Sequence, residues 1–103
     1  EKSSNWTNRF QMFATQNMWT FILLDSYNGR LWQVQYSTQD LDNLFCIPIN
    51  KNELVENNER CVFSIQPLTS MYQYYLINDN TGDMWKFQWS TKGDDYRWIE
   101  RFR

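Results

Sequence analysis

The sequence contains no histidine, and this absence removes the side chain that most often acts as a general base near neutral pH. Triads built on histidine and metal sites with imidazole ligands are excluded with it. Two cysteines, Cys46 and Cys61, are too few for a disulfide-rich scaffold. One disulfide or two buried thiols both remain open, and neither choice indicates a compartment. We expect neither cysteine to be a nucleophile, because no histidine is present to activate it.

Glycine and proline are also scarce, with three and two residues in 103. This composition excludes collagen-like and low-complexity chains. No apolar run approaches the roughly 18 residues of a transmembrane helix, so we expect no membrane span. No signal peptide is visible, and the sequence favours neither a cytoplasmic nor an exported location.

The chain has no marked excess of charge of either sign, since its formal net charge is −2. Nucleic-acid-binding domains concentrate lysine and arginine on one face, and no such cluster is present. The nearest approach is a C-terminal group of arginines with acidic neighbours: Arg97, Arg101 and Arg103 beside Asp94, Asp95 and Glu100. We therefore expect no nucleic-acid partner.

Aromatic residues are abundant, at 18% of the chain, and hydrophobic residues reach 42%. Each buried ring removes about 150–250 Å² from water, so a short chain can still form a dense core. A length of 103 residues fits one domain.

The strongest pattern is an internal repeat with an offset of 53 residues. Met18–Asp25 matches Met71–Asn78 in spacing and chemistry, and the same offset carries Trp32 onto Trp85. Such a match predicts a duplication. The predicted parts are repeat one at 9–50, a polar connector at 51–59 and repeat two at 60–103. Upstream, Arg9–Phe13 resembles Arg60–Ile65 if the second copy carries a small insertion.

Each repeat is predicted to form four strands joined as a meander, because short apolar segments alternate with turn residues. Asp25–Gly29 and Asn78–Gly82 are predicted turns in which glycine supplies a positive φ. One helical turn is expected at Glu53–Glu56 in the connector. The predicted strands are Phe10–Thr15, Trp19–Leu24, Arg30–Ser37 and Leu44–Ile49, followed by Val62–Gln66, Tyr72–Ile77, Asp83–Ser90 and Tyr96–Phe102.

The third strand of each repeat alternates large apolar and polar residues, which predicts one buried face. On this basis we expect four aromatic residues in the core: Trp32, Tyr36, Trp85 and Trp89. The second strand is apolar on both faces in both repeats, which predicts that both of its faces are covered.

A four-stranded meander whose second strand ends in Asp-x-x-x-Gly-x-φ-Trp resembles one blade of a β-propeller. It is similar to the blade-like repeats of small bacterial proteins of uncharacterised function. Asp25, Gly29 and Trp32 carry the motif in repeat one. In repeat two, Asn78 replaces the aspartate. The resemblance specifies a hairpin and implies no functional residue.

The predicted fold class is all-β, with two four-stranded antiparallel meanders from a tandem repeat of about 53 residues, packed with pseudo-twofold symmetry in a propeller-blade-like or sandwich arrangement. Two blades cannot enclose a central channel. We favour a sandwich with pseudo-twofold symmetry that buries both tryptophan rows between the sheets. The alternative is that several chains complete a ring, and self-association would also cover the second strand's apolar faces.

No arrangement of carboxylates indicates an active site. The acidic residues fall in turns and in the connector, with no recognisable pair held across a cleft. Asn78–Asp83 is rich in oxygen ligands, but it lacks the distal glutamate of a calcium loop and is typical of a hairpin turn. We expect no enzyme activity, no catalytic residue, no cofactor and no metal.

The aromatic residues that remain are the candidate contacts. Trp19, Tyr72, Tyr74 and Tyr75 are less firmly assigned to the core, and exposed rings beside amides anchor protein partners or stack on sugars. The sequence therefore indicates a non-catalytic structural or protein-interaction module, with another protein or a second copy as partner. The alternative is a carbohydrate-binding module that uses surface tryptophan and tyrosine.

Overall fold

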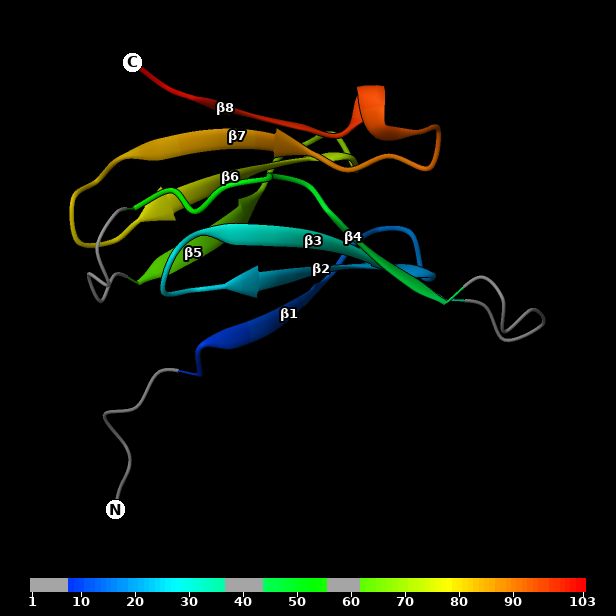
Figure 1. Ribbon diagram of the computed structural model, residues 1–103. Helices are drawn as coiled ribbons and strands as arrows, with labels where there is room; N and C mark the ends of the chain where they lie inside the picture. The colour runs from blue at the N-terminus through cyan, green and yellow to red at the C-terminus, as the bar shows by residue number, and fades with distance from the viewer. Residues whose placement is uncertain (1–7, 37–43, 56–61) are drawn as a thin grey trace.

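A computed structural model of the chain describes residues 8–36, 44–55 and 62–103. These residues form two four-stranded antiparallel meanders that lie in two layers (Figure 1). The predicted all-β class with two four-stranded antiparallel meanders is confirmed, and each predicted strand is present with ends that differ by at most two residues. Sheet 1 contains β1 (Phe10–Ala14), β2 (Thr20–Asp25), β3 (Arg30–Gln35) and β4 (Phe45–Pro48). Sheet 2 contains β5 (Phe63–Pro67), β6 (Gln73–Asn78), β7 (Met84–Gln88) and β8 (Trp98–Arg101), with a 3-10 turn, η2 (Asp94–Tyr96), before β8.

The central hairpin of each sheet turns in the same way. The Gly29 N–H donates to the Asp25 carbonyl at 2.9 Å, and the Gly82 N–H donates to the Asn78 carbonyl at 2.7 Å. Both glycines have a φ of 79°, a conformation that other residues adopt at a cost. The Asp25 carboxylate and the Asn78 amide oxygen each accept a backbone N–H within the turn. Asn78 therefore replaces the aspartate without loss of the turn.

Strand register recurs 53 residues along the chain. Phe10 pairs with Asp25 in sheet 1, and Phe63 pairs with Asn78 in sheet 2. The pairs between the third and fourth strands recur at the same interval. The expected insertion at the start of the second copy is wrong, because Phe63 takes the place of Phe10 without any extra residue.

The two sheets meet through faces that are not equivalent. Sheet 1 turns inward a face of branched aliphatic and polar residues, which we call inner face 1: Ile22, Leu24, Leu31, Gln33 and Ile49. Sheet 2 turns inward its large rings, which we call inner face 2: Phe63, Tyr74, Leu76, Trp85, Phe87 and Trp89. The residues 53 positions after Ile22 and Leu31 are Tyr75 and Met84, which lie on the outward face of sheet 2. The sheets therefore stack face to back.

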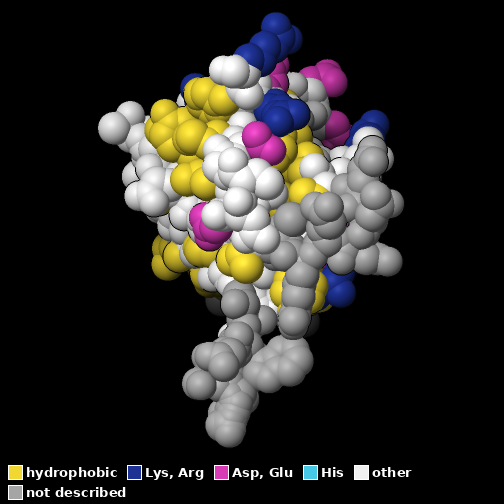
Figure 2. All heavy atoms as spheres, turned by 90° about the vertical axis from the view of Figure 1, so that its left-hand side faces the viewer, with side chains coloured by type: hydrophobic (Ala, Val, Ile, Leu, Met, Phe, Trp, Pro, Cys, Tyr) yellow, Lys and Arg dark blue, Asp and Glu magenta, His cyan; other side chains and the backbone are white. Residues whose placement is uncertain are grey.

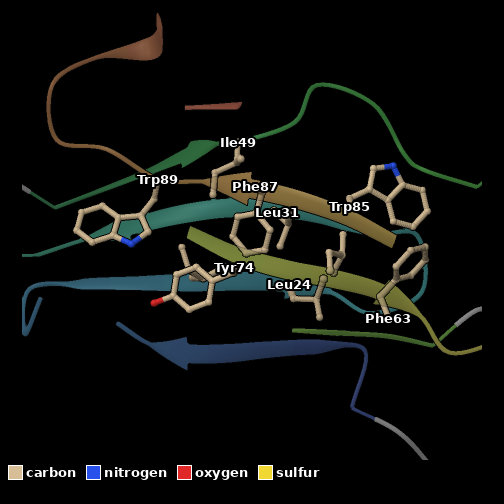
Figure 3. Packing of buried hydrophobic residues seen from close by; sticks show 10 residues of the cluster. Leu24, Leu31, Ile49, Phe63, Tyr74, Trp85, Phe87 and Trp89 are labelled. Atoms are coloured by element: carbon tan, nitrogen blue, oxygen red, sulfur yellow. The ribbon is translucent and has the colours of Figure 1, made fainter. Parts of the chain in front are cut away.

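This stacking corrects two expectations. A pseudo-twofold sandwich would bury the same face of both repeats, so the burial pattern fits the propeller-blade-like arrangement. Trp85 and Trp89 are in the core as predicted, at 7% and 0% exposure, but Trp32 and Tyr36 are only half-buried and face outward. Packed sheets are separated by about 10 Å, and rings opposite smaller aliphatic side chains fill that space. Figure 3 shows Leu24 and Leu31 among the rings of β6 and β7.

Gln33 explains how a polar residue occupies the core. Its side chain is 0% exposed, and its Oε1 accepts the Ser90 backbone N–H at 3.1 Å. Its Nε2 donates to Gln35 at 3.2 Å. Because its amide is hydrogen-bonded on both sides, Gln33 occupies the core without an unsatisfied polar group.

The connector joins the layers without a helix in its described part, 51–55. The helical turn expected at Glu53–Glu56 is absent as far as Val55, and Glu56 lies outside the described residues. The Leu54 N–H donates to the Asn28 carbonyl at 2.8 Å. Its side chain lies against Gly29. The connector thereby fixes the end of the β2–β3 hairpin to the core.

Candidate functional site

The outward side of sheet 1 is an apolar surface that the second sheet does not cover. We call it outer face 1, and it consists of Phe10, Met12, Phe21, Leu23, Trp32, Val34, Tyr36 and Cys46. Phe10 and Met12 are 53% and 56% exposed. The four central residues Phe21, Leu23, Trp32 and Val34 are half-buried. The second sheet therefore covers one face of β2, and the predicted cover of its other face is not supplied by sheet 2.

Aromatic contacts hold outer face 1 in place. The Phe21 and Tyr36 rings stack with centroids 5.9 Å apart, and Trp19 meets Tyr36 edge to face at 5.4 Å. The Phe10 and Trp32 rings lie 6.4 Å apart. These contacts form a preorganised surface, which lowers the entropy cost of binding.

Two arginines, Arg9 and Arg30, lie at the margin of this face. Arg9 makes a two-pronged hydrogen bond to Asp25, whose side chain is 3% exposed. The hydrogen bond to Asp25 raises the pKa of the Arg9 guanidinium above its usual value. The Arg30 guanidinium lies 4.9 Å from the centre of the Trp32 ring. The face is thus apolar at its centre and polar at one end, as protein interfaces are.

Cys46 lies on outer face 1, opposite Val34 in the β3–β4 pairing. Its thiol is free and the residue is exposed. Partial burial of the thiol raises its pKa above the usual value. Cys61 lies outside the described residues, so the alternative of a disulfide or a buried thiol stays open for it.

The outward side of sheet 2 is also partly apolar. We call it outer face 2, and it consists of Tyr75, Ile77, Met84, Lys86, Glu100 and Phe102. The Tyr75 and Phe102 rings meet edge to face at 5.6 Å. Lys86 and Glu100 lie directly opposite each other on β7 and β8. Figure 2 shows hydrophobic side chains reaching the surface in several groups among polar atoms.

A smaller aromatic hollow lies at one end of sheet 2. It encloses about 170 Å³, below the usual size of small-molecule pockets. Tyr72 and Tyr96 line it at 41% and 50% exposure. The Tyr72 ring lies 4.7 Å from that of Trp89, which is fully buried. Polar lining comes from Gln88, Ser90, Thr91 and Lys92.

Two further hollows have fewer features that would recognise a ligand. One, of about 420 Å³, lies between the ends of β1 and β5 and is lined mainly by apolar residues. The other, of about 610 Å³, lies beside β8, where Arg101 pairs with Asp83 at 3.0 Å. Within the described ranges no three metal-ligating side chains gather in one place.

The four candidate contact residues do not form one site. Trp19 is half-buried beside outer face 1, and its counterpart Tyr72 lies in the aromatic hollow of sheet 2. Tyr74 is 5% exposed, stacks on Phe87 at 5.4 Å, and burial raises the pKa of its hydroxyl. Tyr75 is half-buried on outer face 2.

The residues that sequence reasoning missed are those of outer face 1. Trp32 and Val34 alternate with glutamines, so the pattern placed them in the core. The 53-residue equivalence shows that both repeats have a ring-rich face. It does not indicate which repeat buries that face.

No protein-family model, curated protein or solved structure matches this chain. Among the residues that the structure describes, no helix is both long and apolar enough to cross a membrane. The two open faces and the aromatic hollow are thus the candidate binding surfaces of the described residues.

Proposed function

We propose that this chain is a non-catalytic interaction module that binds a protein partner through outer face 1. The observation that carries the proposal is the register equivalence of this face with inner face 2. Phe10, Trp32 and Val34 occupy the positions at which Phe63, Trp85 and Phe87 are buried against the first sheet. A surface with the composition of a core favours an interface over a solvated surface.

Two measurements on the purified chain test this function together: sedimentation velocity and binding of a hydrophobic dye such as ANS. An open face on a monomer binds the dye, and a covered face produces a defined assembly. We expect Val34→Glu to abolish the assembly or, if the wild type is a monomer, to lower its dye binding, because it places a charge at the centre of the face. Thr69→Glu, which adds the same charge at an exposed loop position, is the control. A monodisperse wild-type monomer that binds no dye contradicts the proposal.

Glycan binding is the second candidate, and the aromatic hollow favours it. Tyr72 and Tyr96 offer ring faces beside amide, hydroxyl and ammonium groups, a combination that suits a sugar ring. Trp89 lies beneath Tyr72, so its fluorescence reports on occupancy. A panel of soluble glycans should change this fluorescence in the wild type and in Trp19→Ala, but not in Tyr72→Ala. Unchanged fluorescence across the panel rules this candidate out.

A further inference from the structure

The two open faces of the chain are the counterparts of the two faces that meet inside it. Outer face 1 is equivalent to inner face 2, since Trp32 precedes Trp85 by 53 residues in the same register. Outer face 2 is equivalent to inner face 1, since Met84 follows Leu31 at the same interval. The chain therefore contains one interface between its two sheets. It also exposes both of the surfaces that a second interface of the same kind would need.

We infer that the partner of outer face 1 is outer face 2 of a second copy of this chain, joined head to tail. This inference rests on the proposed function and names its partner. The junction between chains repeats the junction between sheets 1 and 2. A contact of this heterologous kind closes into a ring if the rotation per chain divides a full turn, and otherwise extends as a filament.

The side chains of the open faces suit such a junction. Positions that are aliphatic in inner face 1 stay apolar in outer face 2: Tyr75 for Ile22, Ile77 for Leu24, Met84 for Leu31 and Phe102 for Ile49. Outer face 2 thus has larger residues than inner face 1. Outer face 1 has a smaller side chain than inner face 2 at one central position, because Val34 is the equivalent of Phe87. This smaller side chain offsets the larger ones of outer face 2. The total volume available for packing is thereby roughly maintained, which well-packed interfaces require.

Charge placement is compatible with burial of both faces. Lys86 replaces the buried Gln33, but Glu100 lies across from it on the neighbouring strand. At the margin of outer face 1, Asp25 is paired with Arg9. Each face therefore has a carboxylate beside a basic residue, as an ion pair for Arg9 and Asp25 and as cross-strand neighbours for Lys86 and Glu100, and paired charges are less costly to bury than isolated ones.

A face that pairs with itself is the main competing arrangement. It would place two ring-rich surfaces opposite each other, as in the twofold sandwich that the chain does not form internally. The observed junction sets rings against aliphatic side chains. We therefore assign the head-to-tail arrangement and not an isologous dimer of outer face 1.

A mixing experiment with face-blocked variants tests the inference. Val34→Glu blocks outer face 1, and Tyr75→Glu blocks outer face 2. By sedimentation velocity, the wild type should form a discrete or extended assembly, and each variant alone should be monomeric. An equimolar mixture should give a complex of two chains and nothing larger, because one intact face of each kind remains. Met12→Glu and Phe102→Glu, at exposed positions of the same faces, repeat the test if a first variant does not fold.

Cys46 supplies a second readout because it lies on outer face 1. Thiol labelling, with Cys46 and Cys61 separated by peptide mapping, should be at least about tenfold faster at Cys46 in Tyr75→Glu than in the wild type. Tyr75→Glu leaves the surroundings of Cys46 unchanged and removes only the covering copy. Equal rates in an assembled wild type would contradict burial of outer face 1.

The remaining outcomes separate this inference from the function on which it rests. A dimeric Tyr75→Glu variant means that outer face 1 pairs with itself and overturns the inference. A wild type that stays monomeric up to millimolar concentration also overturns it. If that monomer binds ANS through outer face 1, the proposed function stands with a different protein as partner. If it binds none, both fail.

Discussion

Gly29 and Gly82 share a backbone conformation but have different surroundings. A Cβ on Gly29 would lie 2.9 Å from Leu54 and 3.1 Å from Phe63, whereas a Cβ on Gly82 meets open space. Gly82→Ala should therefore lower the free energy of unfolding by about 1–2 kcal/mol, from backbone strain alone. Gly29→Ala should cost more, because Leu54 must also move. Urea titration of both variants measures the difference, which Leu54→Ala should reduce. Equal costs would mean that the connector does not pack on the hairpin.

Gln33 and Lys86 form a second matched pair at the residue scale. Gln33→Leu removes the acceptor of the buried Ser90 N–H and should cost about 1–3 kcal/mol of unfolding free energy. Lys86→Leu, at the equivalent outward position, should change the stability of the monomer little. Denaturant unfolding in the Tyr75→Glu background compares the two without association. A larger loss for Lys86→Leu would contradict the assignment of inner and outer faces.

Protonation of Asp83 links a single residue to the acid stability of repeat two. The pKa of Asp83 is lowered below its ordinary value, mainly by a hydrogen bond from the Thr81 hydroxyl and secondly by one from the Arg101 guanidinium. The carboxylate therefore stabilises the folded state above its unfolded pKa of about 3.9. That contribution is lost as the pH falls through the lower folded pKa. Wild type should thus exceed Asp83→Asn in stability at pH 7, by a margin that shrinks as the pH falls below about 3.9. Asp95→Asn serves as the control in the same urea titrations.

At the scale of the strands, the two tryptophans of the repeated motif differ in environment. Trp85→Ala opens a cavity in the core and should cost about 3–5 kcal/mol. Trp32→Ala removes a half-buried ring and should cost about half as much or less in a monomeric background. In the wild type, Trp32→Ala should also weaken association in a concentration-dependent way. Equal losses in the Tyr75→Glu background would place Trp32 in the core after all.

Strand positions and turns could be predicted from local sequence, because alternation and the two glycines act within each repeat. The inward face could not, since the second strand is apolar on both sides. The hydrogen bond that satisfies the buried Gln33 amide comes from Ser90, a residue of the other repeat. Alternation predicted that Trp32 lies in the core, but its actual face depends on packing between the two repeats, which the local sequence does not contain. The candidate contacts do not lie together in the structure: Trp19, Tyr72, Tyr74 and Tyr75. The sequence could not predict this, because the stacking of the sheets decides which face of each strand is buried.

For the whole molecule, face-to-back stacking is the feature from which the proposed function follows. A twofold sandwich would leave two identical surfaces, whereas the observed stack leaves two different and complementary ones. The relationship to the family of propeller-blade repeats stays a prediction from the sequence. Register and burial alone define the two open faces, whatever the relation to propeller blades.

Hydroxyl-radical footprinting of the Tyr75→Glu monomer, read by mass spectrometry, tests this stacking most directly. Phe10 and Phe63 are equivalent in register, but their exposures are 53% and 1%. Face-to-back stacking predicts rapid modification of Phe10 and of Trp32, with Phe63 and Trp85 protected. Similar modification of the two members of each pair would show that both repeats bury the same face, and would contradict the account.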